Sequence, residues 1–346
     1  MQRRSMLKVT GKDVKGVISM PPTPTKENGG GWRTTDSIEY DNSKKLINMM
    51  VGAGVKNFAL CGTTGECACL LWDEKKAFIQ TTVEENKKRA IIFAGCTALG
   101  TREVIRQMRA MKDIGADGAF IGLPLWQTPT LDNSVRFYAD LGEALPDFPI
   151  LIYSNYTFFK SDFLPEFWAG IAKTAPTVAC DKISHGTEHI QEDMAAAPNI
   201  NFIPNTGAGY NLWKKSPAGR VTTMWATSPA PEPYVALIDA MNKGDAAKAE
   251  QIQQEIRAAN SPGGAPRPAA AQPEHTTWKE RQETDHARYN AQHNKHMWNV
   301  SGYLNMGPFR APYIDLPAHE AHEIEESMKR WMPFRDRFVK AAAVAK

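Results

Sequence analysis

Short apolar runs alternate with longer amphipathic runs through about the first 240 residues of the chain. Short apolar runs bounded by turn residues are typical of buried strands, whereas amphipathic runs with a period near that of the α-helix predict helices. The runs that predict strands lie at residues 16–20, 55–60, 90–94, 118–121, 149–153, 177–182, 201–204 and 221–225. The runs that predict helices lie at residues 73–86, 101–114, 131–145, 165–172 and 188–196.

This alternation decides the expected fold class, which is α/β. Strands that alternate with helices form parallel sheets, and eight of them in a chain of this length predict a closed (β/α)₈ TIM barrel. A doubly wound open sheet is the structural alternative, and it favours a glycine-rich phosphate loop after the first strand. Residues 21–24 are Pro-Pro-Thr-Pro instead. We therefore expect the barrel.

The pattern changes after residue 240. Residues 243–259 predict a helix, residues 261–273 are rich in Pro, Gly and Ala, and helical stretches resume near Trp278 and over 319–344. Pro and Gly clusters of this kind mark loops. We expect a barrel over residues 1–240 and a C-terminal helical region over residues 241–346 that packs on it.

Composition and charge exclude several classes of protein. Hydrophobic residues make up 42% of the 346 residues and charged residues 23%, which suits a packed core. The formal net charge is only +3, without a dense basic block, so we expect no nucleic-acid partner. The chain has no run of about 18 apolar residues, so we expect no membrane span.

Cysteine usage indicates the compartment. The five cysteines are an odd number, and the Arg3-Arg4 pair near the N-terminus is not followed by an apolar stretch as in an export signal. We expect reduced thiols and a cytoplasmic protein. Cys67 and Cys69 form a lone Cys-x-Cys pair, which favours small buried side chains over half of a metal site.

Candidate catalytic residues stand at the predicted strand ends, because barrel enzymes place their chemistry at the C-terminal rim. Lys182 closes an apolar strand, and desolvation there would lower its pKa and leave neutral amine to attack a ketone. Tyr153 ends the preceding strand and could carry protons. Taken alone, Lys182 could equally form a surface ion pair with Asp181, and Tyr153 could be a core tyrosine.

A third candidate follows the second strand. Residues 62–66 are Gly-Thr-Thr-Gly-Glu, so Thr63 and Thr64 stand between glycines. Backbone N–H groups and hydroxyls of such a turn can converge on a carboxylate. A helix-entry turn capped by threonine is the structural alternative.

These landmarks together resemble the dihydrodipicolinate synthase / N-acetylneuraminate lyase family of class I aldolases. The resemblance rests on residues 62–66, on Tyr153, on Lys182 and on the tail motif Gly-Pro-Phe-Arg-Ala-Pro-Tyr at residues 307–313, and it covers about residues 14–260 in order. It implies that Lys182 forms a Schiff base with a keto acid, that Tyr153 relays protons, and that Thr63 and Thr64 hold the keto-acid carboxylate.

Departures from the family pattern narrow the expected class of substrate. The synthases usually carry an arginine shortly after the tyrosine, but residues 154–160 contain none, and Leu125 and Trp126 replace paired tyrosines after the fourth strand. Trp225 ends the last strand. The mouth thus gains aromatic surface and loses a cation, which suits an aromatic aldehyde fragment. For Phe158 and Phe159 we favour ordinary packing.

The chain is similar to one branch of the family, the trans-o-hydroxybenzylidenepyruvate hydratase-aldolases of aromatic degradation. The similarity lies in residues 62–68 and in the Tyr-x-Asn that Tyr153 and Asn155 form. The expected catalytic residues are therefore Lys182, Tyr153 and Asn155. Expected substrate-binding residues are Thr63, Thr64, Gly65, Trp126, Gly207 and Trp225. The weak match between residues 263 and 303 leaves the role of Asn290 open.

The resemblance implies a lyase that cleaves an arylidene pyruvate to an aromatic aldehyde and pyruvate through the Schiff base on Lys182, without a metal or another cofactor. It also implies a homotetramer whose partners are these small molecules.

Other functions stay open at this point. A synthase or a sugar-acid aldolase is the alternative within the family. A metal-dependent aldolase or hydrolase is a second, since His185 and His189 stand four residues apart. A non-catalytic regulator that binds a keto acid is a third, although binding alone needs neither Lys182 nor Tyr153.

Overall fold

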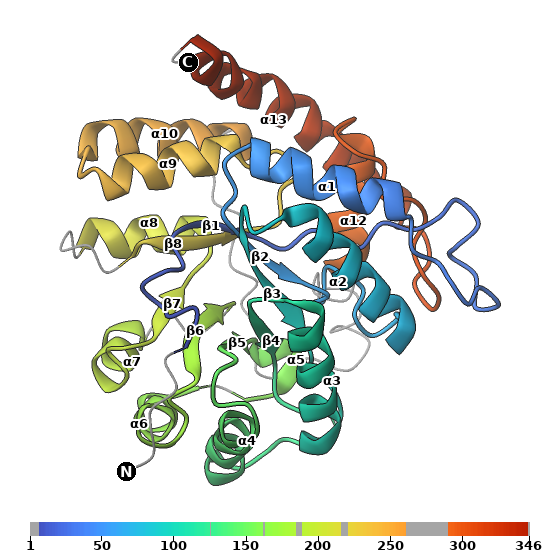
Figure 1. Cartoon of the computed structure of the whole chain (residues 1–346). Coiled ribbons are helices and arrows are strands. Elements are labelled where there is room, and N and C mark those ends of the chain that lie inside the picture. The colour runs from blue at the N-terminus through green and yellow to red at the C-terminus, as the bar shows by residue number, and fades with distance from the viewer. Residues whose placement is uncertain are drawn as a thin grey trace, which may run out of the picture.

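The computed structural model describes residues 7–124, 126–161, 163–184, 189–215, 221–260 and 290–344. Eight short parallel strands form its centre (Figure 1). Their bounds are β1 Gly16–Ser19, β2 Asn57–Leu60, β3 Ile91–Gly95, β4 Gly118–Ile121, β5 Ile150–Ser154, β6 Val178–Ile183, β7 Asn201–Ile203 and β8 Thr223–Ala226. The eight predicted strands are all present, which confirms the TIM barrel.

The sheet curls round until its two ends meet. Strands follow one another in chain order from β1 to β7, and β8 pairs with β1 in parallel, so that Val17 lies opposite Met224. Between β7 and β8 the backbone N–H of Trp225 donates to the carbonyl of Pro204 at 3.0 Å. Closure of this kind brings all carboxyl ends of the strands to one rim.

Helices surround the strands and continue into the C-terminal extension (Figure 1). The helices of the barrel are α1 Tyr40–Gly52, α2 Trp72–Asn86, α3 Thr101–Ile114, α4 Leu131–Ala144, α5 Tyr156–Phe159, α6 Pro165–Thr174, α7 Ile190–Ala196, α8 Thr206–Lys215 and α9 Glu232–Asn242. Those of the extension are α10 Ala246–Asn260, α12 Asn290–Val300 and α13 Ala318–Val344. None of the described helices is long and apolar enough to cross a membrane.

Several of these helices were not predicted. The sequence of α1 carried a usable signal, because its buried residues Ser43, Leu46, Ile47 and Met50 recur at helical spacing. Helix α8 has ten residues and buries Gly209, Tyr210 and Trp213. Helix α12 buries polar side chains, including Gln292 and Lys295. The predicted loop at 261–273 and the helical stretch near Trp278 lie outside the described residues.

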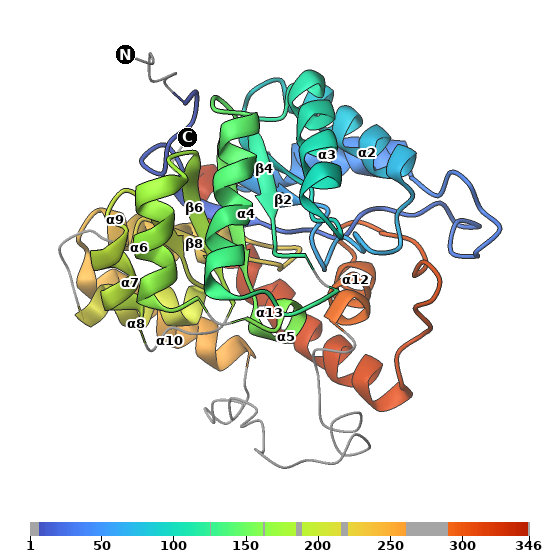
Figure 2. The ribbon, with the colours of Figure 1, turned by 90° about the horizontal axis from the view of Figure 1, so that it is seen from below.

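The extension is attached to the rim of the barrel beside the last strand. The indole N–H of Trp298 in α12 donates to the carbonyl of Thr227 at 3.1 Å, and that of Trp331 in α13 donates to Ala230 at 3.1 Å. Figure 2 shows α12 and α13 next to each other. Two buried indoles thus fix the extension where the catalytic loops of a barrel lie.

Candidate active site

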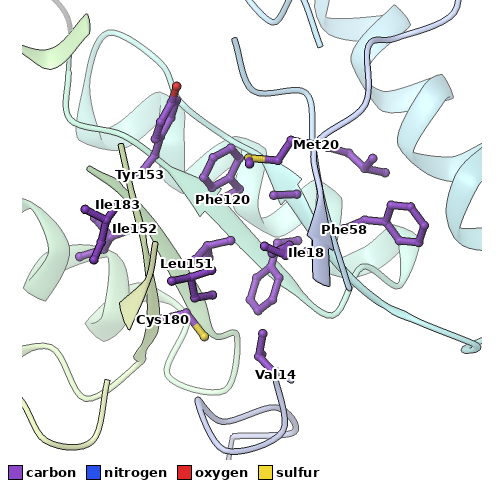
Figure 3. Close-up of a cluster of buried hydrophobic side chains, with 14 of the residues drawn as sticks. Val14, Ile18, Met20, Phe58, Phe120, Leu151, Ile152, Tyr153, Cys180 and Ile183 are labelled. Carbon is purple, nitrogen blue, oxygen red and sulfur yellow. The ribbon is translucent and has the colours of Figure 1, made fainter. Parts of the chain in front are cut away.

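Lys182 and Tyr153 lie side by side at the carboxyl ends of adjacent strands. The register of β5 and β6 pairs Tyr153 with Lys182, as their positions in the sequence predicted. In Figure 3 the tyrosine caps a cluster of buried apolar side chains, and its hydroxyl points away from Leu151 and Val14. The closely packed barrel interior therefore ends in two reactive groups.

The amine of Lys182 is buried and forms no ion pair with a carboxylate of the described residues. The residue is 4% exposed, and Nζ lies 4.6 Å from the centre of the Tyr153 ring and 4.0 Å from that of Trp225. Its hydrogen-bond partner is the hydroxyl of Ser184. Burial lowers the pKa of the amine to about 7, although the Asp181 carboxyl opposes this shift. A substantial fraction of the amine is thus neutral near neutral pH.

Asp181 does not form the surface ion pair that was the alternative for Lys182. Its own side chain is buried and accepts a hydrogen bond of 2.6 Å from the Ser154 hydroxyl. Burial raises the pKa of Asp181 to about 8. The buried carboxyl therefore opposes the lowered pKa of the lysine only in part.

The phenol of Tyr153 is part of a hydrogen-bond chain. Its oxygen lies 3.3 Å from Oγ1 of Thr63 and accepts a bond of 3.1 Å from the Asn155 amide. Burial raises its pKa, whereas these two neighbours lower it. The ring stacks on Phe120 at a centroid distance of 4.9 Å and meets Phe159 edge-on at 5.2 Å. The phenol is thus fixed in place and poised to pass a proton.

The Thr63–Thr64 turn closes the opposite side of the site. The Thr64 hydroxyl donates to the carbonyl of Met20 at 3.0 Å, which ties the turn to the end of β1. Cys61 has a φ of 54°, in the left-handed region that non-glycine residues rarely adopt. The backbone is therefore bent sharply just where β2 ends.

These side chains surround one cavity of about 210 Å³. Six predicted residues line it, namely Thr63, Thr64, Tyr153, Asn155, Lys182 and Trp225. The other lining residues are Met20, Gly62, Phe120, Phe158, Ser184, Asn205, Thr227 and Asn290. Phe158, for which ordinary packing was favoured, packs against the core and also lines the cavity.

Three predicted substrate-binding residues lie away from the cavity wall. Trp126 is 81% exposed. Gly65 lies behind the turn, where its carbonyl accepts a 2.8 Å bond from Thr23 and an added Cβ would come within 3.0 Å of Cys61 Cα. Gly207 is in the first turn of α8, beside Asn205, which does line the cavity. Their roles in binding stay predictions.

Several polar residues of the cavity wall were not among the predicted site residues. Ser184 follows Lys182 by two residues and could have been found from strand alternation. Asn205 and Thr227 stand just after β7 and β8, at the rim, where polar residues are candidates in any barrel. Asn290, whose role the sequence left open, reaches the cavity from α12, far along the chain.

The metal-site alternative finds no support in the part of the chain that the structure describes. His185 lies outside the described residues, and His189 directly precedes α7. Within the described ranges, no group of three or more His, Cys, Asp or Glu side chains could hold a metal ion.

The fold and the site together define a (β/α)₈-barrel protein with a desolvated lysine and a tyrosine at its rim. The model of the Dihydrodipicolinate synthetase family matches residues 13–261, and the chain belongs to this family.

Three relatives refine the comparison. A trans-O-hydroxybenzylidenepyruvate hydratase-aldolase of Pseudomonas aeruginosa is 32% identical over 96% of both chains. A trans-2'-carboxybenzalpyruvate hydratase-aldolase of Nocardioides sp. is 26% identical over 97% of this chain and 98% of its own. The solved structure of PhdJ bound to substrate intermediate superimposes with a TM-score of 0.84 at 27% identity, over 96% of this chain and 100% of that one.

Proposed function

We propose that the protein is a hydratase-aldolase that cleaves an arylidene pyruvate, such as trans-o-hydroxybenzylidenepyruvate, to an aromatic aldehyde and pyruvate. The observation that carries the proposal is the buried amine of Lys182. This amine faces the rings of Tyr153 and Trp225 and bonds the hydroxyl of Ser184. The full-length similarity to hydratase-aldolases supports the same reaction.

The first step uses the neutral amine. Nζ of Lys182 attacks the keto carbon of the substrate, and the carbinolamine loses water to give an iminium ion. The turn at Thr63 and Thr64 holds the adjacent carboxylate through its polar groups. The iminium then withdraws electrons along the conjugated double bond and makes the aryl-bearing carbon electrophilic.

Hydration and cleavage follow at that carbon. Water held by Asn155 and Tyr153 adds its oxygen there, and the neighbouring carbon gains a proton. Tyr153 then removes the proton of the new hydroxyl, the carbon–carbon bond breaks, and its electron pair moves into the iminium to form an enamine. Protonation and hydrolysis release pyruvate and the free lysine, so the net reaction consumes one water.

The cavity walls favour an aryl substituent over a polar chain. Phe120, Phe158 and Trp225 supply aromatic surface, and the Trp225 indole is held by a 2.7 Å bond from its N–H to the Ile183 carbonyl. Lys182 is the only charged residue among the described lining residues. Flat apolar walls of this kind stack well on an aromatic ring.

Turnover of a panel of substrates tests the proposal. Arylidene pyruvates should lose their ultraviolet absorbance as the conjugated bond is hydrated, with pyruvate and aldehyde formed in equal amounts. Borohydride added with pyruvate should attach a stable mass to the peptide that contains Lys182. Preference for aspartate semialdehyde over salicylaldehyde as the partner of pyruvate would instead identify a synthase.

We extend the proposal to the assembly, the compartment and the division of the chain. Family likeness supports a homotetramer, which light scattering on the purified protein can test. The five cysteines form no disulfide, which supports a reducing, cytoplasmic environment. We place the division between barrel and extension at residues 240 and 241, close to the end of α9, and limited proteolysis can map it.

A further inference from the structure

A fully buried ion cluster lies beneath the Thr63–Thr64 turn. Glu66 follows the turn directly and has no exposed surface. Its Oε2 accepts bonds of 2.7 Å from Nζ of Lys295 and 2.6 Å from Nη1 of Arg310, and its Oε1 accepts a 3.0 Å bond from the Arg310 backbone N–H. Both cations belong to the C-terminal extension, more than 200 residues further along the chain.

Arg310 connects this carboxylate to the segment that follows β1. Its Nη1 and Nη2 donate to the carbonyls of Thr23 and Pro24, each at 3.0 Å. The Thr23 hydroxyl in turn donates to the carbonyl of Gly65 in the turn at 2.8 Å. One guanidinium thus holds two neighbouring rim loops together, because its planar fork can serve several acceptors at fixed angles.

Lys295 makes a matching connection from α12. Besides Glu66, its amine donates to the hydroxyl of Thr25. Thr25 is paired with the extension a second time, since its N–H donates to the Met306 carbonyl at 2.8 Å. The amine is therefore bonded to both rim loops, as Arg310 is.

The turn itself needs such support. Glu66 has a φ of 54°, in the left-handed region that a non-glycine residue keeps only when its surroundings hold it there. The site of the Gly65 Cβ is closed by the backbone of Cys61 at 3.0 Å, so the turn is tightly packed. Loss of the bonds to Glu66 would let this backbone relax and move the threonines.

The same ion cluster also includes a residue of α12, the helix that contributes Asn290 to the cavity wall. Helix α12 begins at Asn290, which lines the cavity, and carries Lys295 one and a half turns later. The bond between Lys295 and Glu66 therefore ties the cavity wall of the extension to the turn of the barrel.

We propose that Glu66, Lys295 and Arg310 are positioning residues through which the C-terminal extension holds the keto-acid-binding turn in place. None of the three lines the cavity, so they act through Thr63, Thr64 and Asn290. A buried ion cluster need not add stability over apolar side chains of the same shape, but its directional bonds do fix geometry. The inference rests on the proposed function for the identity of the ligand.

The test is Lys295→Met, which keeps the length of the side chain and removes its charge and donors. We expect KM for pyruvate in the aldol direction to rise by about tenfold, the effect of losing one charge-assisted bond to a group that holds the ligand. We expect kcat to change by less than about threefold, because Lys182 and Tyr153 stay in place. The control is Lys329→Met, whose exposed side chain bonds Glu326 in α13, away from the cavity, and which should leave both constants unchanged.

A merely structural cluster would behave differently. A lowered melting temperature with unchanged KM and kcat in Lys295→Met overturns the proposal. Should that variant fail to fold, the same constants are measured in Lys295→Gln, whose shorter, uncharged side chain loses the charge-assisted bond to Glu66, and wild-type values there overturn it as well.

Borohydride trapping separates this inference from the proposed function. If the wild type turns over no arylidene pyruvate but traps pyruvate on Lys182, the proposed reaction fails and the inference does not. The concentration of pyruvate that gives half-maximal trapping then replaces KM, with the same rise expected in Lys295→Met. Absence of trapping in the wild type overturns both.

Discussion

Three lysines are buried among the described residues, namely Lys75, Lys182 and Lys295, and the last two can be compared at the rim of the barrel because their surroundings differ in one respect. Lys182 lies among aromatic rings and a hydroxyl, whereas Lys295 bonds the carboxylate of Glu66 at 2.7 Å. Burial lowers the pKa of both amines, to about 7 for Lys182 and to about 8 for Lys295, where Glu66 opposes the shift. Burial alone therefore does not define a nucleophile.

The counter-charge separates the two roles. An amine without a carboxylate partner gains reactivity from desolvation, because its neutral form has a free lone pair. An amine bonded to a buried carboxylate has its donors directed at fixed acceptors and serves to hold the structure. The predictions below test this distinction, from the largest expected effect to the smallest.

Replacement of Lys182 should abolish activity without harming the fold. In Lys182→Met we expect turnover to fall by roughly 10⁴-fold or more, because Lys182 is the one lysine among the described residues that line the cavity. The free energy of unfolding at pH 7 should stay equal or increase, since an unpaired buried amine is replaced by an apolar chain. Steady-state kinetics and urea denaturation measure the two quantities. Residual activity near that of the wild type would contradict the assignment.

Replacement of Glu66 should lower the stability of the fold, unlike replacement of Lys182. In Glu66→Gln, Lys295 and Arg310 stay buried without their carboxylate, and we expect unfolding to require about 3–5 kcal/mol less free energy. The urea midpoint measures this, with Glu326→Gln on the exposed face of α13 as the control. A midpoint equal to that of the wild type would mean that the cluster is not charged as described.

The pH dependence of stability should reveal the lowered pKa of Lys182. Between the folded pKa of about 7 and the ordinary lysine pKa of 10.5, the unfolded chain binds a proton that the folded protein lacks, so stability rises with pH. This rise approaches about 1.4 kcal/mol per pH unit for one proton. Below pH 7 the Lys182 amine is protonated in both the folded and the unfolded chain, so it does not make stability depend on pH.

The comparison with Lys182→Met isolates this contribution from that of Lys295. The variant should exceed the wild type in stability most clearly below pH 7, and the gap should narrow as pH rises toward 10. Lys295 has the same sign, from about pH 8 upward, but it is present in both proteins and cancels. A gap that is constant across this range would show that Lys182 titrates normally.

Much of the site could be predicted because it depends on local pattern. Strand alternation and strand ends place Lys182 and Tyr153 on one rim, and the register of β5 and β6 confirms their adjacency. Trp126 shows the limit of such reasoning. It stands near the rim in the sequence, yet its side chain is 81% exposed, because a loop residue has no periodicity that sets its direction.

The sequence by itself determined the barrel, the reactive strand ends and the Thr-Thr turn, because each is encoded by residues that are neighbours along the chain. Only the tertiary structure decided that Asn290 reaches the cavity and that Lys295 and Arg310 meet Glu66. These contacts depend on how the extension folds back onto the rim. The free energy of such long-range pairs comes from burial and charge complementarity in the closed molecule, which no local pattern records.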